Sequence, residues 1–135
     1  MSRPKTTAYA ATRVSPFKTQ EDIEKMLKRH SVETFRWSNY TTTTEFEFEH
    51  QPNKETPPLN FRLFLNWGED RYKPQYFRAL FFFIKSQIES VEFGLFTFTE
   101  AFLPSLVSGE RTIGEIMLDN ISQQKLLPPP AEDAK

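Results

Sequence analysis

Apolar residues recur at helical spacing in a first segment that begins near residue 19. The apolar stripe consists of Ile23, Met26, Leu27 and His30, at positions i, i+3, i+4 and i+7. Thr19 is suited to cap this helix, with Asp22 three residues further on. A helix with one apolar side needs a sheet or another helix to lie on, so this segment predicts a packed amphipathic helix.

Three strands are expected next, because apolar and polar residues alternate with a period of two. The first strand places Phe35 and Trp37 on one face. In the second strand, one face is made of Thr44, Phe46, Phe48 and His50, and the opposite face is made of Glu45, Glu47 and Glu49. The third has an apolar face made of Leu59, Phe61, Leu63, Leu65 and Trp67, and an opposite face made of Asn60, Arg62, Phe64 and Asn66. These strands predict an antiparallel meander with one apolar side.

A long helix follows, with Pro74 in its first turn and Gly94 at its end. Its apolar stripe consists of Phe77, Leu80, Phe81, Ile84, Ile88 and Val91. Phe82 and Phe83 widen the stripe, so we expect something to cover them. Two more helices begin at capping boxes, Thr97–Glu100 and Thr112–Glu115. The predicted fold is therefore α+β: a three-stranded antiparallel meander with helices packed on one face, in the order αβββααα.

A chain of 135 residues is the size of one domain. We expect a flexible basic arm at residues 1–17, a single α+β domain at 18–126 and a Pro-rich polar tail at 127–135. The basic residues of the leading segment, all before the first acidic residue, are Arg3, Lys5, Arg13 and Lys18. The net charge of −1 nevertheless argues against a protein whose main purpose is a sequence-independent grip on phosphate.

The chain contains no cysteine, which excludes disulfides, thiolate nucleophiles and zinc sites of the cysteine type. No stretch approaches the roughly 18 apolar residues that a membrane span needs. These two observations favour a cytoplasmic protein.

A resemblance is carried by short matches along the long helix and both capping boxes. The matching positions are Arg78-Ala79-Leu80, Ile84-Lys85, Ile88-Glu89, Val91-Glu92, Gly94, Thr97-Phe98, Glu100, Phe102-Leu103 and Thr112-Ile113-Gly114-Glu115. Through them, residues 35–118 resemble a group of small uncharacterised proteins of bacteriophages and prophages. The chain departs from that group at Ser108-Gly109-Glu110, where members tend to have a Pro-Asp-Gly turn. The resemblance implies a phage or mobile-element setting in the host cytoplasm, and it transfers no active site.

The acidic stripe of the second strand is the most conspicuous polar feature. Alternate strand residues lie about 6.6 Å apart, too far for two neighbours to hold one metal ion without a further ligand. We expect an exposed face with Arg62 or Lys54 as the cross-strand partner. A metal-dependent nuclease is a less favoured interpretation, because the third strand lacks the acid-x-Lys motif. The two histidines, His30 and His50, are interpreted as a helix-end residue and a residue at the rim of the core, and no cofactor is expected.

Two functional hypotheses remain, and an enzyme is the third and least favoured. The first is a non-enzymatic accessory protein that binds another protein or self-associates, through a candidate surface of Phe82, Phe83, Lys85, Glu89 and Glu92. Lys85 and Glu89 are one helical turn apart and could instead simply pair with each other. The second is binding of single-stranded nucleic acid through the arm and sheet aromatics, with a candidate surface of Arg3, Lys5, Arg13, Lys18, Trp37, Tyr40, Arg62 and Phe64.

Overall fold

The computed structural model describes residues 4–123, so Arg3 and the tail at 127–135 lie outside the described residues. The main elements are α1 (Pro16–Lys28), β1 (Thr34–Asn39), β2 (Thr43–His50), β3 (Leu59–Asn66), α2 (Lys73–Glu92), α3 (Phe98–Ala101) and α4 (Ile113–Ser122). This confirms the predicted α+β class and the order αβββααα. The sequence did not predict the short elements η1 (Asp70–Tyr72), η2 (Leu103–Ser105), β4 (Val107–Ser108) and β5 (Arg111–Thr112).

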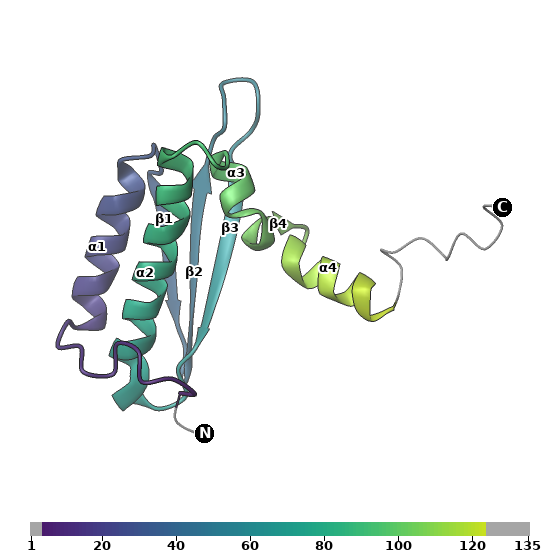
Figure 1. Ribbon diagram of the computed structural model, residues 1–135. Helices are drawn as coiled ribbons and strands as arrows, with labels where there is room; N and C mark the ends of the chain where they lie inside the picture. The colour runs from purple at the N-terminus through teal and green to yellow at the C-terminus, as the bar shows by residue number, and fades with distance from the viewer. Residues whose placement is uncertain (1–3, 124–135) are drawn as a thin grey trace, which may run out of the picture.

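The three long strands form an antiparallel sheet in the order β1-β2-β3, and α1 and α2 lie side by side against one of its faces (Figure 1). The register pairs Trp37 with Phe46 and Phe46 with Leu63, so apolar residues of all three strands share the face that the helices cover. The alternation in the sequence predicted these faces correctly. The opposite face of the sheet carries most of the polar residues of the strands, together with Phe64.

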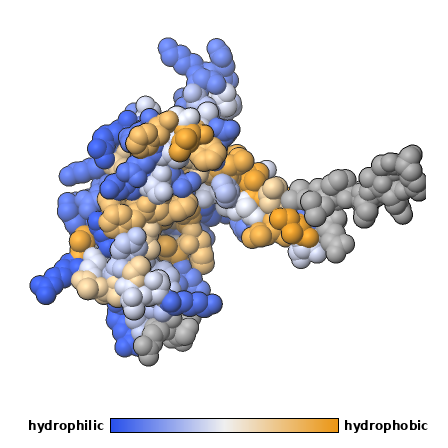
Figure 2. Space-filling view, in the orientation of Figure 1, coloured by the Kyte–Doolittle hydropathy of each residue, from blue (hydrophilic) through white to orange (hydrophobic). Residues whose placement is uncertain are grey.

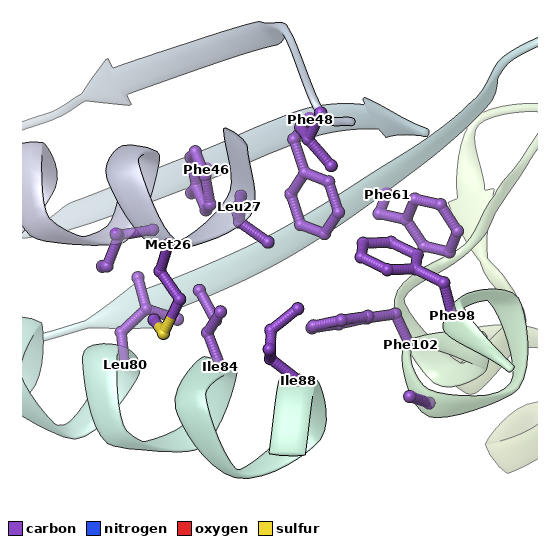
Figure 3. Packing of buried hydrophobic residues seen from close by; sticks show 13 residues of the cluster. Met26, Leu27, Phe46, Phe48, Phe61, Leu80, Ile84, Ile88, Phe98 and Phe102 are labelled. Carbon is purple, nitrogen blue, oxygen red and sulfur yellow. The ribbon is translucent and has the colours of Figure 1, made fainter. Parts of the chain in front are cut away.

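Phenylalanine rings fill the core where the sheet meets α2 and α3. Phe48, Phe61, Phe98 and Phe102 gather at one end of it, and Phe48 and Phe61 stack with ring centroids 5.3 Å apart (Figure 3). Leu80, Ile84 and Ile88 point from α2 toward the sheet in the same view. Full burial of a side chain of this size stabilises the fold by about 1.5–3 kcal/mol, so this cluster is the main source of stability.

The first helix begins earlier than its sequence pattern predicted. Ser15 is the N-cap, and its hydroxyl accepts a hydrogen bond from the Lys18 amide at 3.1 Å, while Pro16 occupies the first turn. The expected cap, Thr19, is instead a buried residue within α1. Its hydroxyl accepts a hydrogen bond from Arg78 of α2 at 3.2 Å, so this residue joins the two helices rather than starting one.

The N-terminal arm lies across the outer side of α2 (Figure 1). The side-chain amide of Gln75 donates to the carbonyl oxygens of Thr6 and Ala8, at 3.1 and 2.7 Å. The ring of Tyr9 stacks on that of Phe82, with centroids 5.0 Å apart. The arm therefore has specific contacts with the body of the domain, and its flexibility stays a prediction.

The last helix departs from the expectation that all helices pack on the sheet. Figure 1 shows α4 projecting away from the β3 side of the sheet, joined to it through η2 and the β4–β5 hairpin. Within the described part of the chain, none of the ten residues of α4 is buried. The apolar residues of α4 therefore lie outside the core.

Candidate functional site

The surface predicted on α2 does not form one continuous patch. Phe82 faces the N-terminal arm and stacks with Tyr9, whereas Phe83 faces α3 and approaches the edge of Phe102 at 6.5 Å between centroids. Both rings stay partly exposed. The expected cover is thus supplied by two different elements, and each leaves part of its ring in contact with solvent.

The charged residues of the same predicted surface are also divided. The Lys85 ammonium lies 5.9 Å from the centroid of the Phe82 ring, and no ion pair between Lys85 and Glu89 is found in residues 4–123. The Glu92 carboxylate lies 3.1 Å from Nε2 of His30, which follows α1. In place of the expected pair with Glu89, Lys85 lies over a ring of its own helix, whereas Glu92 connects α2 to the residues that follow α1.

The predicted nucleic-acid surface is split between the two sides of the sheet. Trp37 lies on the helix side, stacked on Phe46 at 3.9 Å, and its indole N–H donates to Glu24. Phe64 and Arg62 lie on the opposite, open face, and Tyr40 is exposed next to the β1–β2 turn.

The basic residues of that surface are likewise apart from the sheet aromatics. Lys5 and Arg13 are exposed on the arm, which contacts α2, and Lys18 pairs with Asp22 of α1 at 3.1 Å. The described basic residues of the arm therefore do not converge with Phe64 on one surface.

The open face is crossed by a ladder of three charged side chains, one from each strand. Arg36, Glu47 and Arg62 are direct cross-strand partners in the register. The Glu47 carboxylate accepts hydrogen bonds from Nε of Arg36 at 2.8 Å and from Nε of Arg62 at 3.1 Å, and a second one from Nη2 of Arg36. This confirms Arg62, rather than Lys54, as a cross-strand partner of the acidic stripe. We call the three residues the Arg–Glu–Arg ladder.

Glu47 is only 7% exposed although it lies on the open face, because the two arginine side chains cover it. Burial raises the pKa of the Glu47 carboxyl, but the hydrogen bonds from Arg36 and Arg62 together lower it more, so the pKa ends below its usual value. A carboxylate held ionised between two guanidinium groups is a structural anion and a poor general base.

Two hollows open on the same face, of about 350 and 570 Å³. The first is lined in part by Glu47 and Glu49, and the second by Glu45 and Glu115. Each hollow is also lined by an arginine, Arg36 in the first and Arg62 in the second, so neither presents carboxylates alone.

The sequence did not predict two exposed apolar regions: one lies between α2 and α3, where Phe93, Leu95 and Phe96 are 82%, 71% and 52% exposed, and the other lies on α4. Met117, Leu118 and Ile121 lie on one flank of this helix, at positions i, i+1 and i+4. They are 43%, 68% and 55% exposed. Figure 2 shows apolar residues concentrated along this projecting helix and near the upper ends of α2 and α3. We call the three residues the α4 flank.

The first turn of α4 is closed by a capping box and lies against η2. The hydroxyl of Thr112 accepts a hydrogen bond from the Glu115 amide at 3.2 Å, and the Glu115 carboxylate accepts one from the Thr112 amide at 3.0 Å. Gly114 lies against Pro104 so closely that a Cβ atom there would stand 2.9 Å from the Pro104 carbonyl oxygen. The direction of α4 is thus set at its root.

An apolar groove lies where the α4 flank meets this root. It has a volume of about 360 Å³ and is lined by Leu103, Pro104, Ile113, Gly114, Met117 and Leu118. We call it the root groove. A cavity of about 150 Å³ can hold a benzene-sized molecule, so the root groove has room for aliphatic side chains.

A sequence signal for the α4 flank existed. The run Ile116-Met117-Leu118 makes the helix apolar over more than one stripe, as Phe82 and Phe83 do on α2. An apolar surface this wide indicates that the helix contacts more than one neighbour. It does not show whether the second neighbour belongs to the same chain.

In residues 4–123, no three histidine, aspartate or glutamate side chains are grouped so that they could hold a metal ion. Over the same residues, no helix is both long enough and apolar enough to cross a bilayer. No protein-family model, no curated protein and no solved structure was found to match the chain.

Proposed function

We propose that this protein is a non-catalytic accessory protein of a phage or mobile genetic element that acts as a self-assembly module. The observation that carries the proposal is the α4 flank, with Leu118 68% exposed on a helix that contributes no buried residue within the described part of the chain. The phage setting is supported by the resemblance of residues 35–118. Self-assembly belongs to the protein-binding class that the sequence favoured, with a different surface.

A helix as short as α4 needs tertiary contacts to be stable. Isolated helices shorter than about 12–15 residues are marginal in water, because nucleation is costly. α4 has ten residues, and its contacts with the domain are concentrated at its root, with η2 and β5. Coverage of its apolar flank by a second molecule would stabilise it, which supports α4 as the binding element.

The positions of the acidic residues of α4 also support association through its apolar flank. Glu115 and Asp119 are four residues apart and share the side of α4 away from Met117 and Ile121. Asp119 lies 3.8 Å from Arg111, which balances part of that charge. Two copies can therefore approach through the α4 flank without bringing these carboxylates together.

Sedimentation velocity on the full chain tests the proposal. We expect the weight-average mass to rise above 15.9 kDa between about 5 and about 500 µM, a range that brackets weak interfaces. Leu118→Asp should abolish the rise, because it places a charge in the contact. Leu95→Asp is the matched control, since Leu95 is similarly exposed, at 71%, but lies in the α2–α3 loop.

Three outcomes would contradict the proposal. A wild-type chain that stays monomeric over the whole range has no self-assembly activity. Loss of association in Leu95→Asp but not in Leu118→Asp would move the contact to the α2–α3 loop. An equal loss in both variants would indicate nonspecific hydrophobic association.

A further inference from the structure

The root groove and Ile121, the last residue of the α4 flank, lie toward opposite ends of the same helix. The groove is at the N-terminal end of α4, where Leu103 and Pro104 stand beside Gly114. Ile121 is at the other end, seven residues from Gly114, which corresponds to about 10 Å along the axis at 1.5 Å per residue. One chain therefore carries both an apolar groove and an exposed apolar side chain to fill one.

We propose that two copies pair antiparallel through α4, with Ile121 of each copy seated in the root groove of the other. This inference rests on the proposed self-assembly and specifies its geometry. A single two-fold axis near residues 117 and 118 produces both contacts at once, as expected for a closed dimer in which both partners use the same surface.

The antiparallel arrangement follows from where the groove and the free end lie. In a parallel pair, the two Ile121 side chains would contact each other. The two root grooves would face each other at the other end of the helices, and no side chain would fill them. A parallel pair would also bring the two domains together at the same end, since each domain is attached at the root of α4 (Figure 1). Antiparallel helices moreover place opposite ends of their dipoles side by side.

The size of the contact predicts a weak dimer. A ten-residue helix is about 15 Å long, and two such flanks with their grooves bury less than the roughly 1,200 Å² at which standard interfaces begin. We therefore expect a dimer that forms at hundreds of micromolar, and that dissociates on dilution to roughly 10 µM.

Because the chain has no cysteine, single-cysteine variants report contacts without background. We would prepare Leu103→Cys, Ile121→Cys and Leu95→Cys, all at exposed positions. Each pair is mixed at high concentration, oxidised, and analysed by non-reducing electrophoresis and mass spectrometry. Disulfides need Cα atoms about 4.4–6.8 Å apart, so they form efficiently only between neighbouring positions.

The expected result is a mixed disulfide between Leu103→Cys and Ile121→Cys, at least several-fold more abundant than either self-disulfide. The control mixture of Leu95→Cys with Ile121→Cys should give little mixed product. Adding Leu118→Asp to both variants of the first pair should remove the disulfide.

Failure of the inference can be told apart from failure of the proposed function. If Ile121→Cys alone gives the dominant disulfide, the helices pair in parallel and the antiparallel geometry is wrong, although self-assembly stands. The antiparallel geometry is equally wrong if sedimentation shows a dimer sensitive to Leu118→Asp but no pair of variants is linked. If sedimentation shows only monomer at all concentrations, both proposals fall.

Discussion

Replacing Glu47 with glutamine tests how much the Arg–Glu–Arg ladder contributes to stability. Glutamine keeps the shape of the side chain, but it removes the charge and presents one NH₂ group where a carboxylate oxygen accepted a hydrogen bond. That NH₂ group would face a guanidinium donor from Arg36 or Arg62, which lie at 2.8 and 3.1 Å through their Nε atoms. We expect the free energy of unfolding to fall.

The size of this decrease in the free energy of unfolding depends mainly on the hydrogen bond between Glu47 and Arg62. The side chain of Arg62 is 26% exposed, whereas that of Arg36 is 72% exposed, so solvent screens the second contact far more. Hydrogen bonds to charged groups contribute about 1.5–3 kcal/mol when buried. Allowing for the remaining exposure and the retained shape, Glu47→Gln should lower the free energy of unfolding by about 1–2 kcal/mol.

Urea unfolding followed by circular dichroism measures this change. Glu49→Gln is the matched control, because Glu49 is two residues away on the same face of β2 and is exposed. Its effect should stay within about 0.5 kcal/mol, as for ordinary surface substitutions. Equal effects of the two substitutions at neutral pH would refute the reasoning, since the ladder would then add nothing to a surface glutamate.

The pH dependence of the same difference provides a second check. Burial raises the pKa of Glu47 and the two arginines lower it more, so its folded pKa lies below the unfolded value of about 4.3. A carboxyl with a lowered folded pKa stabilises the fold above its unfolded pKa, and this stabilisation is lost as the pH falls through the folded value. The gap between wild type and Glu47→Gln should therefore be full at pH 7 and shrink below about pH 4.

Two further predictions concern the end of the core and the root of α4. Burial, and then the charge of His30, lowers the pKa of His50, so the unfolded chain binds the proton more readily than the folded one. The free energy of unfolding should therefore fall as the pH drops below about 6.5. Urea titrations at about pH 7.5 and 5.5 measure this dependence, and His50→Gln should weaken it. Gly114→Ala should lower the thermal midpoint even though alanine normally stabilises helices, because its Cβ would lie 2.9 Å from the Pro104 carbonyl oxygen. A raised thermal midpoint would contradict this expectation, because the backbone at Pro104 would then have moved to accommodate the added methyl group at little cost.

The sequence correctly predicted which residues of each strand share a face. It was less successful in predicting which residues lie beside each other on neighbouring strands. Alternation determines that Glu47 and Phe48 point to opposite sides, because the strand period is two. It does not determine which residue of the next strand lies alongside, since that depends on turn lengths. The turn after Asn39 sets the register that brings Arg36 beside Glu47. The alternation in that strand indicates the apolar face of Phe35 and Trp37, and it does not identify Arg36 as the partner of Glu47.

Helix starts depend on which of several competing caps makes its hydrogen bond. Thr19 and Asp22 satisfied the pattern of a cap, but Ser15 followed by Pro16 satisfied another. The earlier cap adds a turn, and this places Thr19 opposite Arg78, where its hydroxyl has a tertiary role. Local sequence could have suggested Ser15, while the role of Thr19 follows from packing of the two helices.

The separation of α4 from the core makes stability and association independent properties of this chain. The buried cluster draws its residues from α1, β2, β3, α2, α3 and the chain next to them, and within residues 4–123 α4 adds none. Leu118→Asp should therefore leave the unfolding midpoint of the dilute monomer unchanged while it removes association at high concentration. If the substitution destabilised the dilute monomer by as much as a core change, about 2 kcal/mol or more, the α4 flank itself would have to pack on its own domain in solution. The flank would then be part of the fold, and self-assembly through it would be untenable.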